Sequence, residues 1–360
     1  MNFLKQIKPL FFKKEKSIPL EEAVNAIDSQ WHKVMDIEVI HLPELLQLNL
    51  QMINFSGMIP DRFPEMGVLE LKNASVCGRN GWVMNREGYW IPELSWYGSN
   101  FNELSFSTEK HKLKKIKGSC LSICSDWSDT NYSHFLLDTL GRFELYRQAG
   151  FSIADVDFVY CPIPSLFAEI LLKRLGIPIS KCILPETGKA YQFERLIVPS
   201  FPGYRRVYPQ WLVEFLRNEF TEKPAKKIRR LYIPRNTSRK ISNEKELIPI
   251  LEELGFEVFE PSIHMETPAR FAEAEIVIGA HGAALANLAF CQPGTKVLEL
   301  MPSDHIFPHW YSLSVAGKME YSFIVGKSER ERPFPKFGPS PYDFYIDSKI
   351  FEKALSELIS

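Results

Sequence analysis

Short apolar runs alternate with amphipathic stretches along most of the chain. In its middle third, the apolar runs predict strands, and the stretches with helical periodicity predict helices. The predicted strands are residues 118–125, 157–162 and 193–200, and the predicted helices are residues 131–150, 165–176 and 209–220. Gly150 follows the first of these helices and is a candidate for its C-cap.

The alternation becomes more regular after residue 228. The predicted strands there are residues 229–235, 256–261, 275–280, 295–300 and 319–325, and the predicted helices are residues 243–255, 268–274, 282–290 and 309–317. Strands that alternate with helices at this spacing form right-handed βαβ crossovers and a parallel sheet. Their nearly continuous apolar character agrees, because such strands are buried on both faces. The pattern therefore predicts two α/β lobes.

The remaining segments carry weaker patterns. Residues 76–92 predict strands joined by tight turns, as in a small β-meander, and residues 221–227, polar with a proline, predict an inter-domain linker. The predicted organisation is an N-terminal extension with the β-rich part of the first lobe at 1–118, the α/β part of that lobe at 119–222, a Rossmann-like second lobe at 226–328, and a proline-rich excursion with a final helix at 329–360.

Composition narrows the class of protein. The 360 residues are 45% hydrophobic and 13% aromatic, which supports packed lobes and excludes a disordered chain. The formal net charge of -1 gives no overall basic field, so we expect no nucleic-acid partner. The six cysteines include no CxxC pair or zinc-ligand cluster, which fits scattered buried thiols in a reducing compartment. Without a secretory signal or an apolar run of roughly 20 residues, we expect a soluble cytoplasmic protein.

The first sixteen residues qualify that expectation. Residues 1–16 combine five lysines with six large apolar side chains. Basic and aromatic side chains in one short segment are typical of a peripheral membrane contact, here at the inner face of the cytoplasmic membrane. Pro9 opposes this interpretation, because proline breaks the helix that such an anchor uses. A frayed, solvated terminus is the alternative.

Two loops of the second lobe carry candidate ligand chemistry. The first passes from strand 275–280 through His281 and Gly282 into the next predicted helix, and its small residues let a ligand approach the backbone. First-turn N–H groups and the helix dipole favour an anion at such a position. The alternative is a tight turn whose small residues serve packing alone, with His281 as a structural histidine.

The second loop is basic. Arg235 directly follows the first strand of the second lobe, and Arg239 and Lys240 come four and five residues later. Guanidinium groups suit the bidentate recognition of phosphate oxygens, and the alternative is a solvated basic loop. Because parallel strands end at the same edge of a sheet, the two loops together predict one diphosphate site.

A third group of polar residues opens the long helix of the first lobe. Its members are Asn131, Tyr132, His134 and Asp138. The i,i+4 spacing of His134 and Asp138 projects both side chains from one helical face. An aspartate beside a histidine can act as general base on a hydroxyl, or orient the histidine to do so. The alternative is that Ser128 or Asp129 caps the helix and His134 packs internally.

Three sequence blocks closely resemble the signature blocks of glycosyltransferase family 61. They are NYSHFLLD at 131–138, YIPRNTSRKISNE at 232–244 and GAHGAALANLAFCQPGTKVLEL at 279–300. The resemblance implies an inverting transfer of a sugar from a nucleotide donor, usually UDP-linked, within a GT-B-like fold of two Rossmann-like lobes with the donor cleft between them. The family includes bacterial capsular-polysaccharide enzymes, so a role in surface or capsular polysaccharide biosynthesis is expected.

The resemblance also implies roles for individual residues. Donor-binding residues would be Arg235, Arg239, Lys240, His281, Gly282, Ala283, Asn287 and Glu299. Among these, Glu299 would meet ribose or base hydroxyls, and Lys240 departs from the family, which usually has arginine there. Asn131 and Tyr132 would line the acceptor side, with Asp138 or His134 as the base.

The expected partners are a nucleotide-sugar donor and a glycan or lipid-linked glycan acceptor, with no further cofactor. Asp155 and Asp157 match the Asp-x-Asp motif with which many other glycosyltransferases bind a metal ion. They precede an apolar strand instead of ending one, so we expect them to cap a turn and expect no metal site. Two alternatives remain: a non-catalytic nucleotide- or glycan-binding protein, and a polysaccharide-modifying transferase with a non-sugar donor. No GxGxxG or GxSxG motif supports a dehydrogenase or a serine hydrolase.

Overall fold

The computed structural model describes residues 17–41, 55, 57–95, 112–221, 226–261, 266–330 and 340–360. The chain divides into two compact units. The first unit comprises Met1–Glu38 and Pro64–Arg205, and the second comprises Val39–Phe63 and Arg206–Ser360. The predicted organisation differs, because it assigned residues 39–63 and 206–222 to the first lobe.

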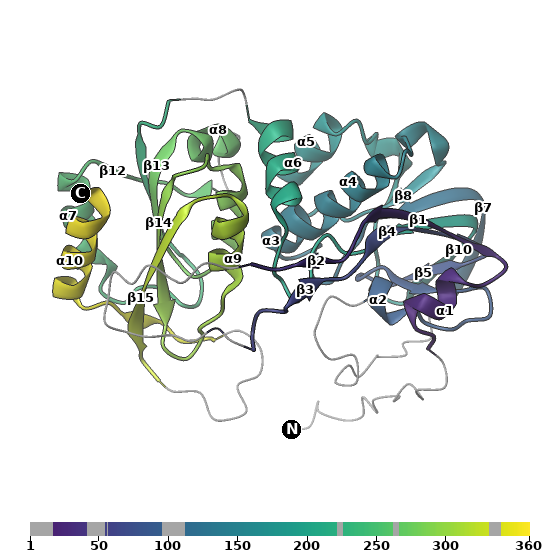
Figure 1. Ribbon diagram of the computed structural model, residues 1–360, viewed down its shortest axis with the longest axis horizontal. Coiled ribbons are helices and arrows are strands. Elements are labelled where there is room, and N and C mark those ends of the chain that lie inside the picture. The colour runs from purple at the N-terminus through teal and green to yellow at the C-terminus, as the bar shows by residue number, and fades with distance from the viewer. Residues whose placement is uncertain are drawn as a thin grey trace, which may run out of the picture. The chain divides into compact units, whose positions relative to one another are not determined.

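The first unit is built on a sheet that mixes parallel and antiparallel strands (Figure 1). Its strand order is β1 (Ser29–Met35), β4 (Met66–Lys72), β10 (Lys189–Pro199), β7 (Lys112–Ser122), β8 (Phe158–Tyr160) and β9 (Cys182–Ile183). The strands from β10 to β9 run parallel, whereas β1 and β4 are antiparallel additions at one edge. The predicted α/β class is confirmed, and the departure from a purely parallel sheet comes from strands of the N-terminal segment.

The strand–turn–strand predicted within residues 76–92 is confirmed as a hairpin of β5 (Ser75–Cys77) and β6 (Trp82–Met84). Gly81 in its turn has a φ of 69°, and a Cβ atom there would come within 2.5 Å of the Cβ of Cys124. Both the left-handed backbone and the close approach to the loop after β7 therefore require glycine.

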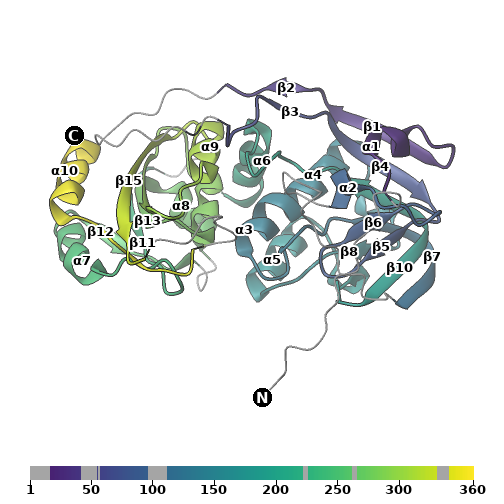
Figure 2. The ribbon, with the colours of Figure 1, turned by 90° about the horizontal axis from the view of Figure 1, so that it is seen from below.

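The two faces of this sheet are covered differently (Figure 2). The helices α4 (Leu140–Gln148) and α5 (Leu166–Arg174) lie on one face, while α1 (Leu20–Val24) and α2 (Pro92–Ser95) lie on the other. The β5–β6 hairpin belongs to the sheet itself, because β5 pairs with β10. Three smaller groups of elements complete the first part of the chain: the paired strands β2 (Glu38–Val39) and β3 (Arg62–Phe63), and the 3-10 turns η4 (Ile153–Asp155) and η5 (Ile179–Lys181).

The helix predicted at residues 131–150 is present but has three parts. α3 (Tyr132–His134) continues into a π-helical turn, η3 (Phe135–Thr139), and then into α4. In η3 the N–H of Leu140 donates to the carbonyl of Phe135, five residues earlier. Gly150 follows the helix with a φ of 89°, and its N–H bonds to the carbonyl of Arg147, so the predicted cap is confirmed.

The second unit has a sheet that is parallel except at one edge. Its order is β12 (Phe256–Val258), β11 (Arg229–Ile233), β13 (Ala274–Ala280), β14 (Lys296–Pro302), β15 (Glu320–Ser328) and β16 (Phe344–Tyr345), of which β16 is antiparallel. α7 (Glu244–Glu253) and α10 (Ser348–Ile359) cover one face and bury a shared aliphatic core against the strands. This arrangement confirms the βαβ alternation predicted after residue 228.

The opposite face of the second sheet carries four elements that contact one another. They are α6 (Gln210–Phe220), α8 (Thr267–Ala272), η7 (Ala283–Phe290) and α9 (His309–Ala316). α6 belongs here because Arg217 donates to the carbonyl of Gly317 at 3.1 Å and Phe220 contacts Phe290. The helix predicted at 282–290 is a 3-10 helix, with the N–H of Leu285 bonded to the carbonyl of Gly282.

All six cysteines are free thiols, and five of them are buried. Burial raises the pKa of Cys77 and of Cys124 to about 12, so these thiols stay protonated and unreactive near neutral pH. The predicted scatter of buried thiols is therefore confirmed. Among the described residues, no helix is long and apolar enough to cross a membrane.

Candidate active site

The basic and the small-residue loops of the second unit meet at the same edge of its sheet. β11 and β13 are parallel neighbours, with Ile233 opposite Gly279 where both strands end. The chain leaves β11 toward α7 on one face and leaves β13 toward η7 on the other, which makes this edge a topological switch point. Ligands of open α/β sheets bind at such points. The predicted proximity of the two loops is confirmed.

Arg235 and Gly282 lie in direct contact at this edge. A Cβ atom on Gly282 would overlap the Nη1 atom of Arg235. The guanidinium is further held by a hydrogen bond from its Nε to the carbonyl of Ser238. Burial lowers the pKa of Arg235, while the charge of Asp343 acts in the opposite direction. The geometry therefore sets a partly buried guanidinium over the backbone at the start of η7.

This contact gives a specific expectation for Gly282→Ala. The added methyl group displaces the guanidinium of Arg235, and we expect nucleotide affinity to fall roughly 10- to 100-fold, as for the loss of a charge-assisted hydrogen bond. Isothermal titration with UDP measures the change. The unfolding temperature without ligand should change little, because the methyl group meets the end of a flexible side chain. Unaltered UDP affinity would remove Arg235 from the site.

A buried carboxylate orients the imidazole ring of His281. Its Nδ1 hydrogen-bonds Oε1 of Glu299, and the hydroxyl of Tyr321 donates to Oε2 of the same carboxylate. Glu299 is fully buried, and burial together with its negative charge raises the pKa of Tyr321. Both oxygens of Glu299 are thus engaged, so this geometry favours a role in positioning His281 over the predicted contact with ribose. The hydrogen bond at Nδ1 leaves Nε2 as the ring nitrogen that can meet a ligand.

Aromatic side chains surround the imidazole of His281. The ring of His305 is 5.0 Å away between centroids, and the rings of Phe307, His309 and Trp310 lie within 6.5 Å. His305 and Phe307 come from the loop after β14, and the other two from the start of α9. A charge on a ligand here would be less screened by water than at an open surface, because these four aromatic rings lie around the imidazole.

The other predicted donor residues have structural contacts of their own. Arg239 is buried and donates to the carbonyl of Ser340 at 3.4 Å, while the exposed Lys240 lies 3.5 Å from a carboxylate oxygen of Asp343. Asn287 is buried within η7, where its amide donates to the carbonyl of Ala284 at 2.8 Å, and Ala283 begins that helix. Their contacts with a donor stay predictions.

The predicted pair of the first unit is formed. His134 Nδ1 and Asp138 Oδ2 are 2.7 Å apart, and Asp138 is fully buried whereas His134 keeps 7% of its surface exposed. They lie on the helix that follows β7, which is flanked in the sheet by β8 on one side and β10 on the other. The pair therefore lies beyond the carboxyl end of a parallel strand, where ligands of open α/β sheets bind. The geometry makes Asp138 the group that orients the ring and His134 the group that can reach a substrate.

The residue that caps the helix of this pair differs from those considered in the sequence analysis. The helix is capped by Asn131, whose side-chain oxygen accepts from the N–H of Ser133 at 3.0 Å, and not by Ser128 or Asp129. Tyr132 is partly buried, which raises its pKa, and its ring lies 6.1 Å from that of Phe167. Asn131 is therefore a structural cap, and its predicted contact with the acceptor stays a prediction.

Two residues near the pair escaped the sequence analysis. Arg142, one turn after Asp138, is fully buried and donates to the carbonyls of Leu94, Cys124 and Pro199. An arginine among the apolar positions of a helix is the signal that could have revealed it. Trp127 is the second, since its ring centroid lies 5.3 Å from that of His134.

Asp155 has the predicted role of capping a turn, whereas Asp157 bonds to a residue of β7. Asp155 accepts from the N–H of Ser152 at 2.6 Å, and Asp157 accepts from the N–H of Ser119 at 2.8 Å. In the described part of the chain, no group of three histidine, cysteine or carboxylate side chains has the geometry of a metal site.

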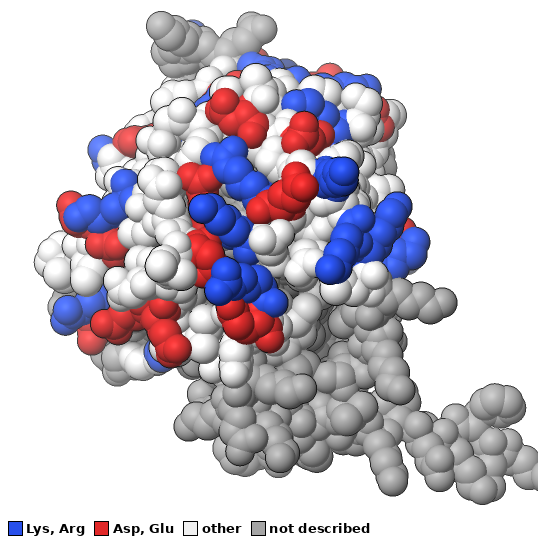
Figure 3. All heavy atoms as spheres, turned by 90° about the vertical axis from the view of Figure 1, so that its right-hand side faces the viewer, with Lys and Arg blue, Asp and Glu red and all other residues white. Residues whose placement is uncertain are grey.

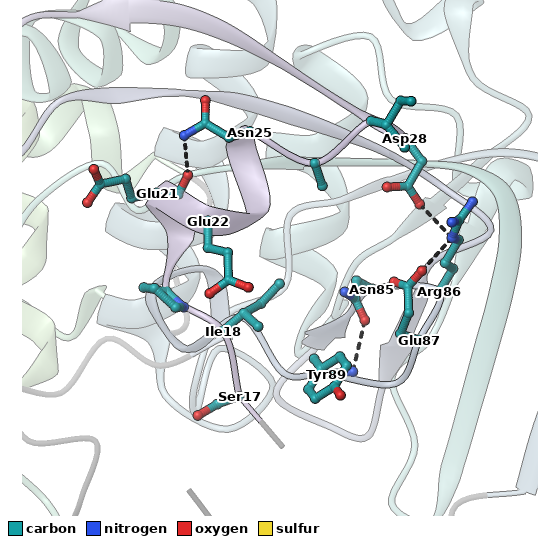
Figure 4. Close-up of a pocket in the computed structure, with 13 residues that line it drawn as sticks. Ser17, Ile18, Glu21, Glu22, Asn25, Asp28, Asn85, Arg86, Glu87 and Tyr89 are labelled. Carbon is teal, nitrogen blue, oxygen red and sulfur yellow. Dashed lines mark hydrogen bonds and ion pairs between the residues drawn. The ribbon is translucent and has the colours of Figure 1, made fainter. Parts of the chain in front are cut away.

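Acidic and basic side chains are interspersed on the face of the molecule seen in Figure 3, without one dominant sign. A pocket of about 930 Å³ in the first unit is lined by four carboxylates, among them Glu21 and Glu22 (Figure 4). Its single arginine, Arg86, is paired with the other two, Asp28 and Glu87. This pocket does not suit an anionic nucleotide.

Comparison with known proteins finds a family match for the central part of the chain. The model of the family Glycosyltransferase 61 matches residues 132–298, which contain the His134–Asp138 pair, Arg235 and His281. The matched residues, fewer than half of the 360, form a region similar to glycosyltransferase family 61. The resemblance noted in the sequence is thereby confirmed. The family 61 domain begins in the helix after β7 of the first unit and ends in β14 of the second.

Two curated relatives come from Oryza sativa subsp. japonica. A beta-1,2-xylosyltransferase is 46% identical over 52 residues, which are 14% of this chain and 10% of the relative. An alpha-1,3-arabinosyltransferase is 34% identical over 149 residues, which are 38% of this chain and 24% of the relative. The chain thus spans at most about a quarter of the length of these relatives.

Proposed function

We propose that this protein is an inverting glycosyltransferase that moves a sugar from a nucleotide donor, UDP-linked, to a hydroxyl group of a glycan. The observation that carries the proposal is the contact of Arg235 with Gly282 beside the His281–Glu299 pair, at the switch point of a family 61 domain. A guanidinium beside a glycine is suited to a pyrophosphate, because the phosphates can lie directly against the glycine backbone.

In this proposal the second unit binds the donor. Arg235 holds an oxygen of the pyrophosphate, and His281 in its imidazolium form, with Nδ1–H held by Glu299, donates from Nε2 to another. Negative charge grows on the leaving phosphate as the bond to the sugar breaks, so fixed positive groups there stabilise the transition state more than the bound donor. Arginine and histidine supply this charge in place of a metal ion, and no further cofactor is needed.

The first unit activates the acceptor. Nε2 of His134 accepts the proton of the acceptor hydroxyl, while Asp138 holds Nδ1–H and stabilises the imidazolium that forms. The hydroxyl oxygen then attacks the anomeric carbon from the side opposite the nucleotide, and the bond from that carbon to the phosphate oxygen breaks. One such displacement inverts the anomeric configuration. A GT-B-like arrangement of the two units, with the donor cleft between them, would bring both groups to one sugar.

The biological setting follows from the family and from the start of the chain. We propose surface or capsular polysaccharide biosynthesis at the cytoplasmic face of the membrane, with a lipid-linked glycan as one acceptor. Residues 1–16, whose basic and apolar side chains suggested membrane contact, lie outside the described residues. The names of the two rice relatives add pentoses to the candidate donor sugars.

Thermal unfolding with nucleotides tests the donor site. We expect UDP to raise the unfolding temperature, while GDP, CMP and NAD do not. A ligand at 100 times its dissociation constant adds about 2.7 kcal/mol, which corresponds to several degrees for domains of this size. A shift with GDP or CMP alone would reassign the nucleotide, and no shift with any of them would favour a non-catalytic glycan-binding protein or a non-sugar donor.

Transfer is then measured with a panel of donors that includes UDP-xylose, UDP-arabinose and UDP-glucose. The anomeric configuration of the product, read by NMR, tests inversion. A product with retained configuration would contradict the single displacement even if UDP binds.

A further inference from the structure

We propose that a second pocket of the first unit binds a neutral sugar ring of the acceptor glycan, beside His134. The proposal rests on the function proposed above, because it names what the acceptor site recognises. The pocket has a volume of about 290 Å³, near the lower limit for small-ligand pockets. The lining residues that matter here are Arg79, Asn80, Trp82, Trp127 and Asp129.

Trp127 is held in an unfavourable backbone conformation. Its φ is 57°, in the left-handed region that bulky residues avoid. Its carbonyl accepts hydrogen bonds from the N–H groups of Thr130 and Asn131, at 2.9 and 2.7 Å. These bonds fix the turn, and the tryptophan in it is 39% exposed. Strained residues of this kind gather at binding and catalytic sites, and here the strained residue presents a large apolar ring.

The pocket combines an apolar surface with polar groups of opposite charge. Asp129 accepts from the guanidinium of Arg79 at 2.5 Å, and Trp82 donates from its ring nitrogen to Asp126 at 3.3 Å. A pyranose has an apolar C–H face, which packs on an aromatic ring, and a hydroxyl edge that both donates and accepts hydrogen bonds. The paired charges of Arg79 and Asp129 cancel, so the pocket suits a neutral sugar better than a phosphate or a uronate.

Trp127 joins this pocket to the proposed base. The indole lines the pocket and is also the ring that lies 5.3 Å from the imidazole of His134. A glycan that packs against Trp127 therefore extends toward His134, where a hydroxyl of the same or the next sugar can be deprotonated. Eight of the ten lining residues precede residue 132, where the family match begins, and the other two are Thr187 and Gly188. Acceptor choice would thus depend on a part of the chain outside the matched domain.

Binding without turnover tests this inference. The full chain is screened on an array of neutral oligosaccharides with xylo-, arabino-, gluco- and galacto-configured residues, and the tightest is titrated by calorimetry. We expect Trp127→Ala to weaken its binding roughly 10- to 100-fold and Trp127→Phe to retain most of it. Tyr89→Ala is the matched control, because Tyr89 is also 39% exposed in the first unit but lines the acidic pocket. The control should bind as the wild type does.

Three results would overturn the proposed glycan pocket, and a separate measurement tests the donor site. Wild-type affinity in a folded Trp127→Ala variant, or a wild-type protein that binds no neutral glycan of the array, would overturn the inference. Equal losses in Trp127→Ala and Tyr89→Ala would also overturn it. UDP binding is measured in parallel on the same variants and should not change. Absence of UDP binding in every variant would contradict the proposed donor site, whereas the glycan titration would still decide the role of Trp127.

Discussion

Replacing His134 by alanine is expected to lower kcat for sugar transfer about 10²- to 10⁴-fold, the usual contribution of a general base. The side chain is the only member of the His134–Asp138 pair with exposed surface, since Asp138 is fully buried. The affinity for UDP should not change, because the proposed nucleotide site belongs to the second unit. Initial rates at saturating donor and acceptor, together with a UDP titration, measure both quantities.

Asp138→Asn provides the matched variant for this prediction. An asparagine keeps the shape but can present its NH2 group to Nδ1, which would favour the tautomer that lacks a free electron pair at Nε2. We therefore expect a large loss of kcat here as well, with UDP binding retained. Near wild-type turnover in His134→Ala would show that another group accepts the proton.

Replacing Arg142 by methionine is expected to destabilise the protein by about 2–5 kcal/mol without a direct effect on nucleotide binding. Three buried carbonyls, those of Leu94, Cys124 and Pro199, would lose their donor. The loss is partly offset because burying the charge is itself unfavourable, and burial lowers the pKa of Arg142 to about 10. Urea unfolding followed by circular dichroism measures the change.

Two further substitutions sharpen this test. Arg142→Lys should be at least as damaging as Arg142→Met, because an ammonium group keeps the buried charge but cannot span three carbonyls. Arg147→Met, a surface control on the same helix whose partner is Glu144, should cost well under about 1 kcal/mol. If Arg142→Met unfolds at the wild-type urea concentration, the carbonyl contacts contribute little to stability.

The order of strands and helices was predictable from the sequence, because the burial of one face gives each type of element its own spacing of apolar residues. In the second unit every predicted strand was found, and the placement of the loops after β11 and β13 at one edge followed from the rule that parallel strands end at the same edge. Contacts that depend on the direction of one side chain were not predictable. Periodicity places Glu299 in a buried strand, but only the packed structure reveals that Tyr321 on the next strand and His281 use both of its oxygens.

Long-range contacts of loops and the packing partners of helices were also not predictable from the sequence. Arg239 has a left-handed backbone, with a φ of 64°, and its side chain bonds to Ser340, a residue about a hundred positions later. No local pattern foretells a contact of that sequence separation. Likewise α6 looks like any amphipathic helix, so its sequence could not indicate which of two units would bury its apolar face.

The π-helical turn Phe135–Thr139 sets the direction of His134 relative to that of Arg142 on the same helix. An α-helix advances about 100° per residue, so an extra residue in one turn changes the angular phase of everything that follows it. His134 and Asp138 lie within or before that turn, and Arg142 lies after it. Removing the extra residue would turn the arginine away from its three carbonyls, or the histidine away from the surface. The number of residues between His134 and Arg142 is therefore fixed by both side chains at once.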